Sequence, residues 1–360
     1  MTDHRQARQA VVRDAIGPWA EAFLVSHLPN VRWLTGFSGS AGVVLFAAGR
    51  VTLITDFRYG TQAPAEVGGA ADVIIERASV WDRLKRVLDD LPARTLAFES
   101  HVVPVRDAER LGSLFRGTLV PVADVIEGPR QVKDADEVAA IRAAGALAGE
   151  ALDEVLPTIR AGEREIDVAA RLELALRRRG SQWHPFQTIV AAGPRSALPH
   201  ARSSDHEIER GTFLLIDFGA VVDGYCSDIT RTVAIGEIDG RQRAVYDLVR
   251  DAQLQARDGL RSGMTGREGD ALARDLIAAR GYGDAFGHSL GHGLGLEVHE
   301  APRLAVTAEA TIPAGTVVTV EPGVYLPGWG GVRLEDDVWV GPDGAVLLTD
   351  GNTELITLDR

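Results

Sequence analysis

The sequence has only one cysteine, Cys226, among its 360 residues, so no disulfide can form within the chain. Long hydrophobic runs are also absent: the longest, such as residues 41–48, have the length of a β-strand. No basic run of five or more residues occurs, and the net charge of −13 disfavours nucleic acid and anionic membranes as partners. Because no apolar segment of signal-peptide length follows the first eight residues, we expect a cytoplasmic protein.

The length of the chain predicts two domains, because single hydrophobic cores rarely grow beyond roughly 250–300 residues. Apolar residues make up 45% and charged residues 25% of the sequence, which supports a sizeable core. Gly128-Pro129, followed by the polar residues 130–134, is typical of a linker. We therefore expect an N-terminal domain at residues 1–129 and a C-terminal domain at residues 130–360.

Short apolar runs alternate with glycine and serine turns in the first of these domains. Between residues 22 and 56 this pattern predicts short strands, and residues 33–42 are one such run with its turn. Helical patterns cover residues 80–90 and 105–114, and the strand-like residues 95–98 lie between them. The alternation predicts an α/β domain.

After the linker the same order of elements occurs twice: helix, helix, β-hairpin. The first hairpin contains Asp217 and the second contains Glu321, 104 residues later, and the first helices of the two sets are separated by about the same interval. This agreement indicates a structural repeat. The four expected helices are residues 136–156, 165–179, 242–260 and 267–280.

The first hairpin places two carboxylates among apolar residues. Asp223-Gly224 lies between its two strands and tolerates the positive φ angles of a tight turn. A two-residue turn there pairs Asp217 with Thr230 and puts Asp228 diagonally across from Asp217 on the same face. Two buried carboxylates require a cation or hydrogen-bonding partners, so the hairpin predicts a counter-charge nearby.

The second hairpin supplies two more acids, because Glu321 falls opposite Glu335 if the loop is centred on Gly328. A glycine-rich loop between the hairpins contains three histidines. Four carboxylates and one of these imidazoles exceed what a single divalent ion needs, so we predict two ions that share bridging carboxylates. The three histidines are His288, His292 and His299.

Five short motifs surround these residues in a fixed order: Ile216-Asp217-Phe218-Gly219, Asp228-Ile229-Thr230-Arg231-Thr232, Gly291-His292-Gly293-Leu294-Gly295, Val320-Glu321-Pro322-Gly323 and Arg333-Leu334-Glu335-Asp336. On these motifs, the chain from about Val132 onward resembles the pita-bread metallopeptidases, and most of all their Xaa-Pro aminopeptidase and prolidase branch. Residues 33–42 resemble part of that branch's N-terminal domain. The resemblance implies an α+β protein: a pita-bread catalytic domain with a pseudo-twofold helix-helix-hairpin repeat, preceded by a creatinase-like α/β domain.

The resemblance also assigns the metal ligands, which are Asp217, Asp228, His292, Glu321 and Glu335. It implies two divalent ions, with Mn²⁺ as the first choice and Co²⁺ or Zn²⁺ as alternatives. A hydroxide that bridges the two ions is expected to attack the carbonyl that precedes a proline, with Glu321 as the proton acceptor.

Further residues match catalytic and substrate-binding positions of the same family. His200 and His299 match histidines that contact substrate and, as protonated rings, stabilise the developing oxyanion. His288 matches a proton-shuttling histidine of the aminopeptidases. Arg333 and Tyr325 match residues near the metals, and we expect Arg333 to act in catalysis and Tyr325 in substrate binding.

The sequence leaves the specificity open between two enzymes. His288 and the loop at residues 327–331 favour an Xaa-Pro aminopeptidase that acts on proline-containing peptides. Arg303 matches the arginine with which prolidases bind the free carboxylate of a dipeptide, so a prolidase (Xaa-Pro dipeptidase) is the alternative. A non-catalytic binding protein on the same fold is more distant, because no metal ligand is missing. The resemblance also implies a homodimer.

Overall fold

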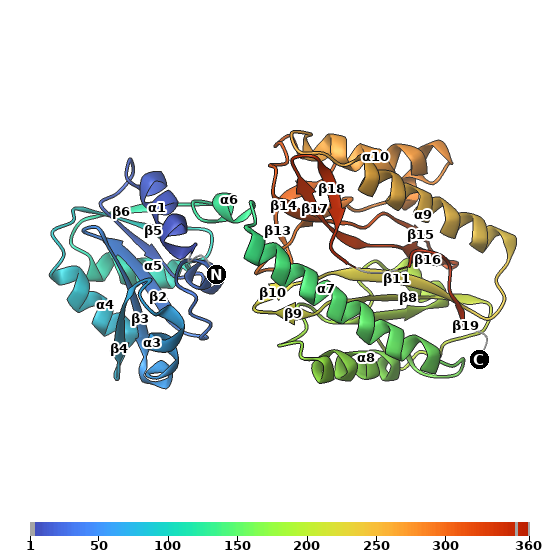
Figure 1. The fold of residues 1–360 in the computed structure, drawn as a ribbon, viewed down its shortest axis with the longest axis horizontal. Helices are drawn as coiled ribbons and strands as arrows, with labels where there is room; N and C mark the ends of the chain where they lie inside the picture. The colour runs from blue at the N-terminus through green and yellow to red at the C-terminus, as the bar shows by residue number, and fades with distance from the viewer. Residues whose placement is uncertain (1–3, 350–351, 359–360) are drawn as a thin grey trace. The chain divides into compact units, whose positions relative to one another are not determined.

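The computed structural model describes residues 4–349 and 352–358. The chain forms two compact units, one ending at Arg130 and the other beginning at Gln131 (Figure 1). Each unit has its own sheet and its own cluster of buried apolar side chains. Within the described residues, no helix is long and apolar enough to cross a bilayer.

The first unit is built on one sheet of six strands: β1 (Ala22–Val25), β2 (Gly42–Ala47), β3 (Arg50–Asp56), β4 (Asp72–Glu76), β5 (Thr95–Glu99) and β6 (Thr118–Val122). They lie in the order β4-β3-β2-β1-β5-β6. β1 is antiparallel to β2 and parallel to β5, and β5 is parallel to β6. The carboxyl ends of β1, β5 and β6 therefore meet at one edge of the sheet.

Five helices surround this sheet, and a short sixth one ends the unit (Figure 1). They are α1 (Arg5–Ile16), α2 (Leu28–Thr35), α3 (Gln62–Val67), α4 (Val80–Asp89), α5 (Val105–Leu114) and α6 (Glu127–Arg130). Helices α4 and α5 agree closely with the predicted ranges.

One expectation for the first unit was wrong, and another gains a helix. Trp33-Leu34-Thr35 belongs to helix α2 and not to a strand; Pro29 in its first turn favours helix initiation, and Gly36, with φ of 80°, ends it. Gly128-Pro129, expected at the start of the linker, lies in the short helix α6, which ends where the two units divide. Proline and glycine are compatible with a helix this short, because no interior hydrogen bond is lost.

The second unit begins with two helices and a four-stranded sheet. The helices are α7 (Ala135–Val155) and α8 (Glu165–Arg179), and the strands β7 (Ile189–Ala192), β8 (Thr212–Phe218), β11 (Ile229–Ile235) and β19 (Thr357–Leu358) lie in the order β19-β11-β8-β7. Asp217 pairs with Thr230, which confirms the predicted register. A short inner pair, β9 (Val221–Val222) and β10 (Tyr225–Cys226), closes the hairpin at Asp223, whose φ is 47°.

The same order then recurs with helices α9 (Gly240–Gly259) and α10 (Gly266–Ala279). The second sheet has the order β13-β12-β14-β17-β18, with strands β12 (Gly291–Gly293), β13 (Glu300–Leu304), β14 (Thr316–Val320), β17 (Asp336–Gly341) and β18 (Gly344–Leu347). Strands β15 (Gly323–Leu326) and β16 (Gly330–Arg333) form a separate inner hairpin.

The second hairpin keeps one register through both of its parts. Val320 pairs with Asp336 in the outer part, and Gly323 pairs with Arg333 in the inner part. Glu321 and Glu335 therefore lie opposite one another where the two parts meet, as predicted. The four helices of this unit agree with the sequence pattern to within two residues at either end. Capping boxes fix the starts of α7, α9 and α10.

Two apolar clusters hold the halves of the second unit. Side chains of α7 and α8 pack with β8 and β11 in one, and side chains of α9 and α10 pack with β14, β17 and the inner hairpin in the other. Figure 1 shows the two helix pairs on opposite sides of the strands. The ends of the two hairpins consequently face each other between the halves.

Candidate metal centre

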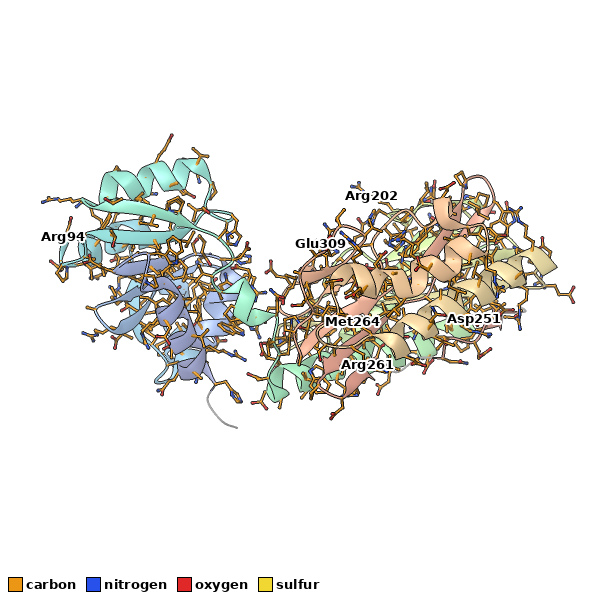
Figure 2. All side chains as sticks on the ribbon, turned by 90° about the horizontal axis from the view of Figure 1, so that it is seen from above. Arg94, Arg202, Asp251, Arg261, Met264 and Glu309 are labelled. Atoms are coloured by element: carbon orange, nitrogen blue, oxygen red, sulfur yellow. The ribbon has the colours of Figure 1, made fainter. Side chains whose placement is uncertain are left out.

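A cleft of about 1230 Å³ opens between the two halves of the second unit. Its wall contains all five predicted ligand residues together with His200, His288, His299, Arg303 and Arg333. Of the predicted site residues only Tyr325 does not line the cleft, and it lies buried behind His288. Arg202 lies at the outer edge of the unit (Figure 2) and is an exposed residue of the same wall.

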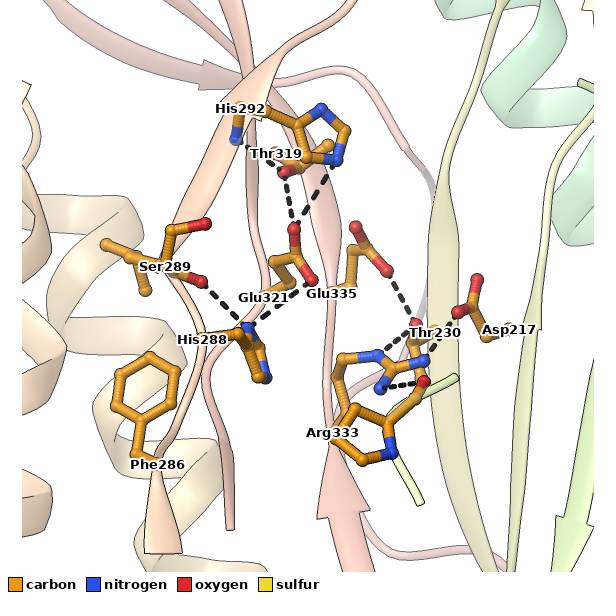
Figure 3. Close-up of polar contacts among 12 residues, drawn as sticks. Asp217, Thr230, Phe286, His288, Ser289, His292, Thr319, Glu321, Arg333 and Glu335 are labelled. Carbon is orange, nitrogen blue, oxygen red and sulfur yellow. Dashed lines mark hydrogen bonds and ion pairs between the residues drawn. The ribbon is translucent and has the colours of Figure 1, made fainter. Parts of the chain in front are cut away.

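Three buried side chains from different elements form the tightest group of potential ligands. One ligand atom each from Asp228, His292 and Glu335 lies within 4.8 Å of the other two. The Nε2 atom of His292 is 3.8 Å from Asp228 Oδ2 and 3.4 Å from Glu321 Oε1. The structure thus brings four of the five predicted ligands around one point. Figure 3 shows three of them, His292, Glu321 and Glu335.

The imidazole of His292 is oriented as a ligand. Its Nδ1 lies 3.0 Å from the carbonyl oxygen of Gly293, and this bond fixes the tautomer with hydrogen on Nδ1. The lone pair of Nε2 then faces the carboxylates. Burial lowers the pKa of His292 to about 4, so the ring is neutral near pH 7, as metal binding requires.

Threonine hydroxyls hold two of the acids in place. Thr230 Oγ1 donates a hydrogen bond of 2.5 Å to Glu335 Oε2, and Thr319 Oγ1 donates one of 3.2 Å to Glu321 Oε1. Thr230 belongs to the first hairpin, whereas Glu335 belongs to the second. The orientation of Glu335 therefore depends on the docking of the two halves.

Asp217 lies beside the group and has a cationic partner. Arg333 donates from Nη2 to Asp217 Oδ2 over 2.5 Å, and its Nε donates to Thr230 Oγ1 over 3.0 Å (Figure 3). The guanidinium also donates to the hydroxyl of Tyr325 over 2.7 Å. The buried guanidinium of Arg333, a residue of the inner part of the second hairpin, is thus hydrogen-bonded to Asp217 and Thr230 of the first hairpin.

The four carboxylates share a buried space with one arginine. Burial raises the pKa of Asp217, Asp228 and Glu335, and it raises the pKa of Glu321 to about 8. Repulsion among the acids adds to the effect at Asp228 and Glu335. Such crowding of like charges is stable when cations neutralise it.

Divalent ions fit this donor set. Asp217 Oδ1 and Asp228 Oδ1 are buried and have no hydrogen-bond partner within the part of the chain that the structure describes. Unsatisfied carboxylate oxygens are rare in protein interiors, and here they lie beside an imidazole whose lone pair is available. Residues Asp217, Asp228, His292, Glu321 and Glu335 are suited to hold the ions by oxygen and nitrogen donors.

His288 belongs to a chain of hydrogen bonds behind the acids. Its Nδ1 lies 2.8 Å from the carbonyl oxygen of Ser289, and its Nε2 lies 2.9 Å from the Tyr325 hydroxyl. Burial lowers the pKa of His288 to about 4 and raises that of Tyr325 to about 12. The neutral ring therefore donates through Nδ1 and accepts a hydrogen bond from Tyr325, which accepts one from Arg333.

His299 and Arg303 also lie in the wall of the cleft. The ring of His299 is 4.4 Å from that of His292, centroid to centroid. Burial lowers the pKa of His299, which favours its neutral form. Arg303 pairs with His292 in the β12–β13 ladder, which sets its side chain in the cleft wall.

Sequence reasoning missed three residues that position the centre. Thr230 bonds both Glu335 and Arg333; its place opposite Asp217 was predicted, but not its role. Asp337 accepts a hydrogen bond from the backbone N–H of Asp228, and Lys133 pairs with Glu300 beside His299. Asp337 directly follows a motif residue, whereas no local signal marks Lys133.

Two family models match this chain. Metallopeptidase family M24 matches residues 139–342, and the Creatinase/Prolidase N-terminal domain matches residues 16–132. The chain belongs to metallopeptidase family M24. The family resemblance and the fold expected from it, a creatinase-like domain before an α+β pita-bread domain, are confirmed. As an M24 metallopeptidase, the protein works with divalent metal ions.

Several known proteins align with nearly the whole length of this chain. An uncharacterized peptidase of Bacillus subtilis (strain 168), YqhT, is 42% identical over 94% of this chain and 96% of its own. An Xaa-Pro dipeptidase from Bacillus anthracis is 38% identical, with a TM-score of 0.95 over 98% of this chain and 100% of its own. An X-Pro aminopeptidase from Thermotoga maritima MSB8 is also 38% identical, with a TM-score of 0.90 over 96% and 99%.

Proposed function

We propose that this M24 metallopeptidase is an Xaa-Pro aminopeptidase, which hydrolyses the bond between an N-terminal residue and a following proline. The observation that supports this most strongly is the buried group of Asp228, His292 and Glu335 with Glu321, at the end of an open cleft. Solved relatives of the same architecture are named for Xaa-Pro hydrolysis, which supports proline-containing peptides as the substrate class.

Two divalent ions are the proposed cofactors, held by the five ligand residues. Four carboxylates and a single imidazole form a set rich in oxygen, which suits Mn²⁺ first and leaves Co²⁺ or Zn²⁺ as alternatives. When bound, the ions supply an acidified water and a Lewis acid for the carbonyl that precedes proline. The side chains do the rest of the chemistry.

Glu321 is the proposed proton acceptor during attack on the carbonyl. Its carboxylate lies in the cleft wall beside the other ligand groups, within reach of a water held there. Thr319 donates to one of its oxygens and keeps the carboxylate oriented. His200 and His299, both in the cleft wall, donate N–H groups to the oxyanion that develops on the carbonyl oxygen.

The leaving proline nitrogen needs a proton, because a secondary amine anion is a poor leaving group. His288 is the nearest imidazole to Glu321 after His292, with Nδ1 3.9 Å from Glu321 Oε2. We assign to His288 the donation of its Nδ1 proton to the leaving nitrogen, after which the protonated Glu321 returns a proton to Nδ1 and the ring is neutral again. The hydrogen bonds from Arg333 to Tyr325 and from Tyr325 to His288 hold the ring in position.

The size of the cleft supports peptides longer than a dipeptide. Ligand sites for small molecules usually enclose about 300–1,000 Å³, and this cleft of about 1230 Å³ is larger. Its wall includes Ala305, Val306 and Thr307 in addition to the ligand residues, so the space is not confined to the metal centre.

A dipeptidase is the second candidate, and Arg303 favours it. Its guanidinium lies in the cleft wall and makes no hydrogen bond or ion pair within residues 4–349 and 352–358. A free arginine beside a metallopeptidase centre suits the carboxylate of an Xaa-Pro dipeptide.

The two candidates differ in the substrate they prefer. The metal-free protein is loaded with Mn²⁺, and release of the first residue is measured from an Xaa-Pro dipeptide, its C-terminal amide and an Xaa-Pro-Xaa tripeptide. The aminopeptidase is expected to cleave the tripeptide and the amide faster. Preference for the free dipeptide, lost in Arg303→Gln, would establish the dipeptidase instead.

Cleavage of none of these peptides by the Mn²⁺-, Co²⁺- or Zn²⁺-loaded protein would overturn both proposals. We further propose that the protein is a homodimer, on the family resemblance alone. Light scattering after size-exclusion chromatography tests this, and a mass of one chain, 38.5 kDa, would contradict it.

A further inference from the structure

A second group of metal-binding side chains lies in the N-terminal domain. His27 follows β1, His101 follows β5, and Asp124 follows β6, so all three lie at the carboxyl ends of neighbouring strands. These strands are parallel along β1-β5-β6, so the residues come to one edge of the sheet. Glu127, at the start of α6, completes the group.

The distances among these groups suit one small cation. Ligand atoms of His101, Asp124 and Glu127 all lie within 4.8 Å of one another. His101 Nε2 is 3.1 Å and His27 Nδ1 is 3.7 Å from Glu127 Oε1. Two ligands of a tetrahedral zinc ion, each about 2.0–2.1 Å from it, are about 3.3 Å apart, so the two imidazoles are at ligand spacing from the Glu127 carboxyl group. In this structure its Oε1 is hydrogen-bonded to His101 Nε2.

Glu127 is held in place while one of its oxygens stays available. Asn30 donates from Nδ2 to Glu127 Oε1 over 2.6 Å, and Arg130 in turn donates to Asn30 Oδ1 over 2.7 Å. Glu127 Oε2 is buried and has no hydrogen-bond partner in the described part of the chain. A buried carboxylate oxygen without a partner is costly, and a metal ion would satisfy it.

The charge around the group also favours a cation. Asp124 and Glu127 carry two negative charges, and Glu99, a buried third carboxylate, accepts hydrogen bonds from Asn30 and from the backbone of His27. Arg130 reaches this network through Asn30. A divalent ion bound by the two imidazoles would offset the negative charge of these acids.

We propose that His27, His101, Asp124 and Glu127 bind a divalent transition-metal ion of the zinc class in the N-terminal domain. Two imidazoles with two carboxylates select Zn²⁺ and its neighbours over Mg²⁺ or Ca²⁺, which prefer oxygen donors alone. The ion joins the loops after β1, β5 and β6 to α6 and so stabilises the sheet edge. This site does not depend on the proposed function of the cleft.

Equilibrium dialysis of the full chain against Zn²⁺, with bound zinc measured by mass spectrometry, tests the site. His101→Asn removes one imidazole, and Asp124→Asn removes one carboxylate at an exposed position with little risk to folding. His206→Asn, outside both metal groups, is the matched control. Because the cleft also binds zinc, the informative quantity is the difference between each variant and the unchanged protein.

We expect each variant to bind one zinc ion fewer per chain than the unchanged protein and the His206→Asn control. Peptide hydrolysis with Mn²⁺ should stay the same, which shows that the variants are folded and that the cleft is unaffected. Added Zn²⁺ should raise the thermal midpoint of the unchanged protein more than that of the variants. The proposal would be overturned if Asp124→Asn, His101→Asn and the unchanged protein bound the same number of zinc ions per chain. The four residues would then form an ion-pair cluster and no metal site.

Discussion

The two halves of the catalytic domain repeat the same elements but stabilise their acids differently. The first hairpin carries Asp217 and Asp228, and the second carries Glu321 and Glu335, with side chains one methylene longer. Asp217 is held by Arg333 of the second half, whereas Glu335 is held by Thr230 of the first. Each of these two acids is thus held by a residue of the other half, so neither half contains a complete metal site.

Contacts in this domain are of two kinds. Contacts that reach a ligand side chain, such as Arg333 with Asp217 across the halves or Thr319 with Glu321 within one half, orient the ligands directly. Contacts that reach no ligand side chain, such as Tyr225 with Glu137 within one half or Thr232 with the backbone of Arg333 across the halves, hold the elements together without touching the ligands. We expect the first kind to control metal affinity and turnover, and the second kind to control stability alone.

Loss of a ligand should have the largest effect. Asp228→Asn keeps the shape of the side chain but removes its charge, and its Oδ1 is one of the buried oxygens without a partner. Because removal of groups behind a ligand already costs about 10–100-fold, we expect kcat/KM to fall by more than about 100-fold. Bound Mn²⁺ per chain, measured alongside peptide hydrolysis, should fall too.

Asp223→Asn is the matched control for that variant. Asp223 is an exposed turn residue of the same hairpin with φ of 47°, which asparagine tolerates well. Near-normal turnover by Asp228→Asn with full metal content would remove Asp228 from the ligand set.

The second largest effect is expected for Arg333, the main link between halves. Arg333→Lys retains the charge but not the guanidinium that bonds Asp217, Thr230 and Tyr325 together. Turnover should fall about 10–100-fold, and stability should fall by up to about 3–5 kcal/mol, as when a buried ion pair is broken. Urea denaturation and steady-state kinetics measure the two effects. Wild-type turnover and stability in Arg333→Lys would show that the hydrogen bonds of the Arg333 guanidinium to Asp217, Thr230 and Tyr325 are not needed.

A comparison of two threonines on β11 should sharpen the distinction. Thr230→Val removes the hydroxyl that bonds Glu335, and we expect metal affinity to fall about 10–100-fold. Thr232→Val removes a hydroxyl that bonds only the backbone of Arg333, so about 1 kcal/mol of stability should be lost without a change in affinity. Mn²⁺ titration by calorimetry separates the two. Equal affinities in both variants would contradict the role given to Thr230.

The smallest effect is expected for a contact within one half. Tyr225→Phe removes the hydrogen bond of 2.7 Å to Glu137 on α7. About 1 kcal/mol of stability should be lost, which corresponds to a fall of about 2–4 °C in Tm for a domain of this size. Calorimetry measures the shift, and kcat should not change. A large loss of turnover would show that the separation of the two kinds of contact is too simple.

Much of this arrangement could be predicted from the sequence. The registers that place Asp217 opposite Thr230 and Glu321 opposite Glu335 follow from the residue counts around Asp223-Gly224 and Gly328, because strand pairing is symmetric about a turn. The helices of the second unit were predictable from their apolar period. The first unit was less so, because proline and glycine signals near Pro29 and Gly128 are shared by helix ends and loops.

The contacts across the halves could not be predicted in the same way. Thr230 and Glu335 are 105 residues apart, and no local sequence pattern predicts the hydrogen bond between their side chains. The burial that lowers the pKa of His299 could not be predicted either, since it arises in the folded cleft. The sequence motifs identify the metal ligands. The hydrogen bonds that hold Asp217 and Glu335 form only when the two halves pack together.

The central claim is that one site, built from both halves, holds two divalent ions and hydrolyses Xaa-Pro peptides. The most direct test removes metal from the protein with a chelator and then titrates Mn²⁺ while bound metal and tripeptide hydrolysis are followed together. We predict that hydrolysis disappears without metal and returns as the second ion per chain binds. Hydrolysis that persists in the metal-free protein, or a single bound ion at full activity, would contradict the account.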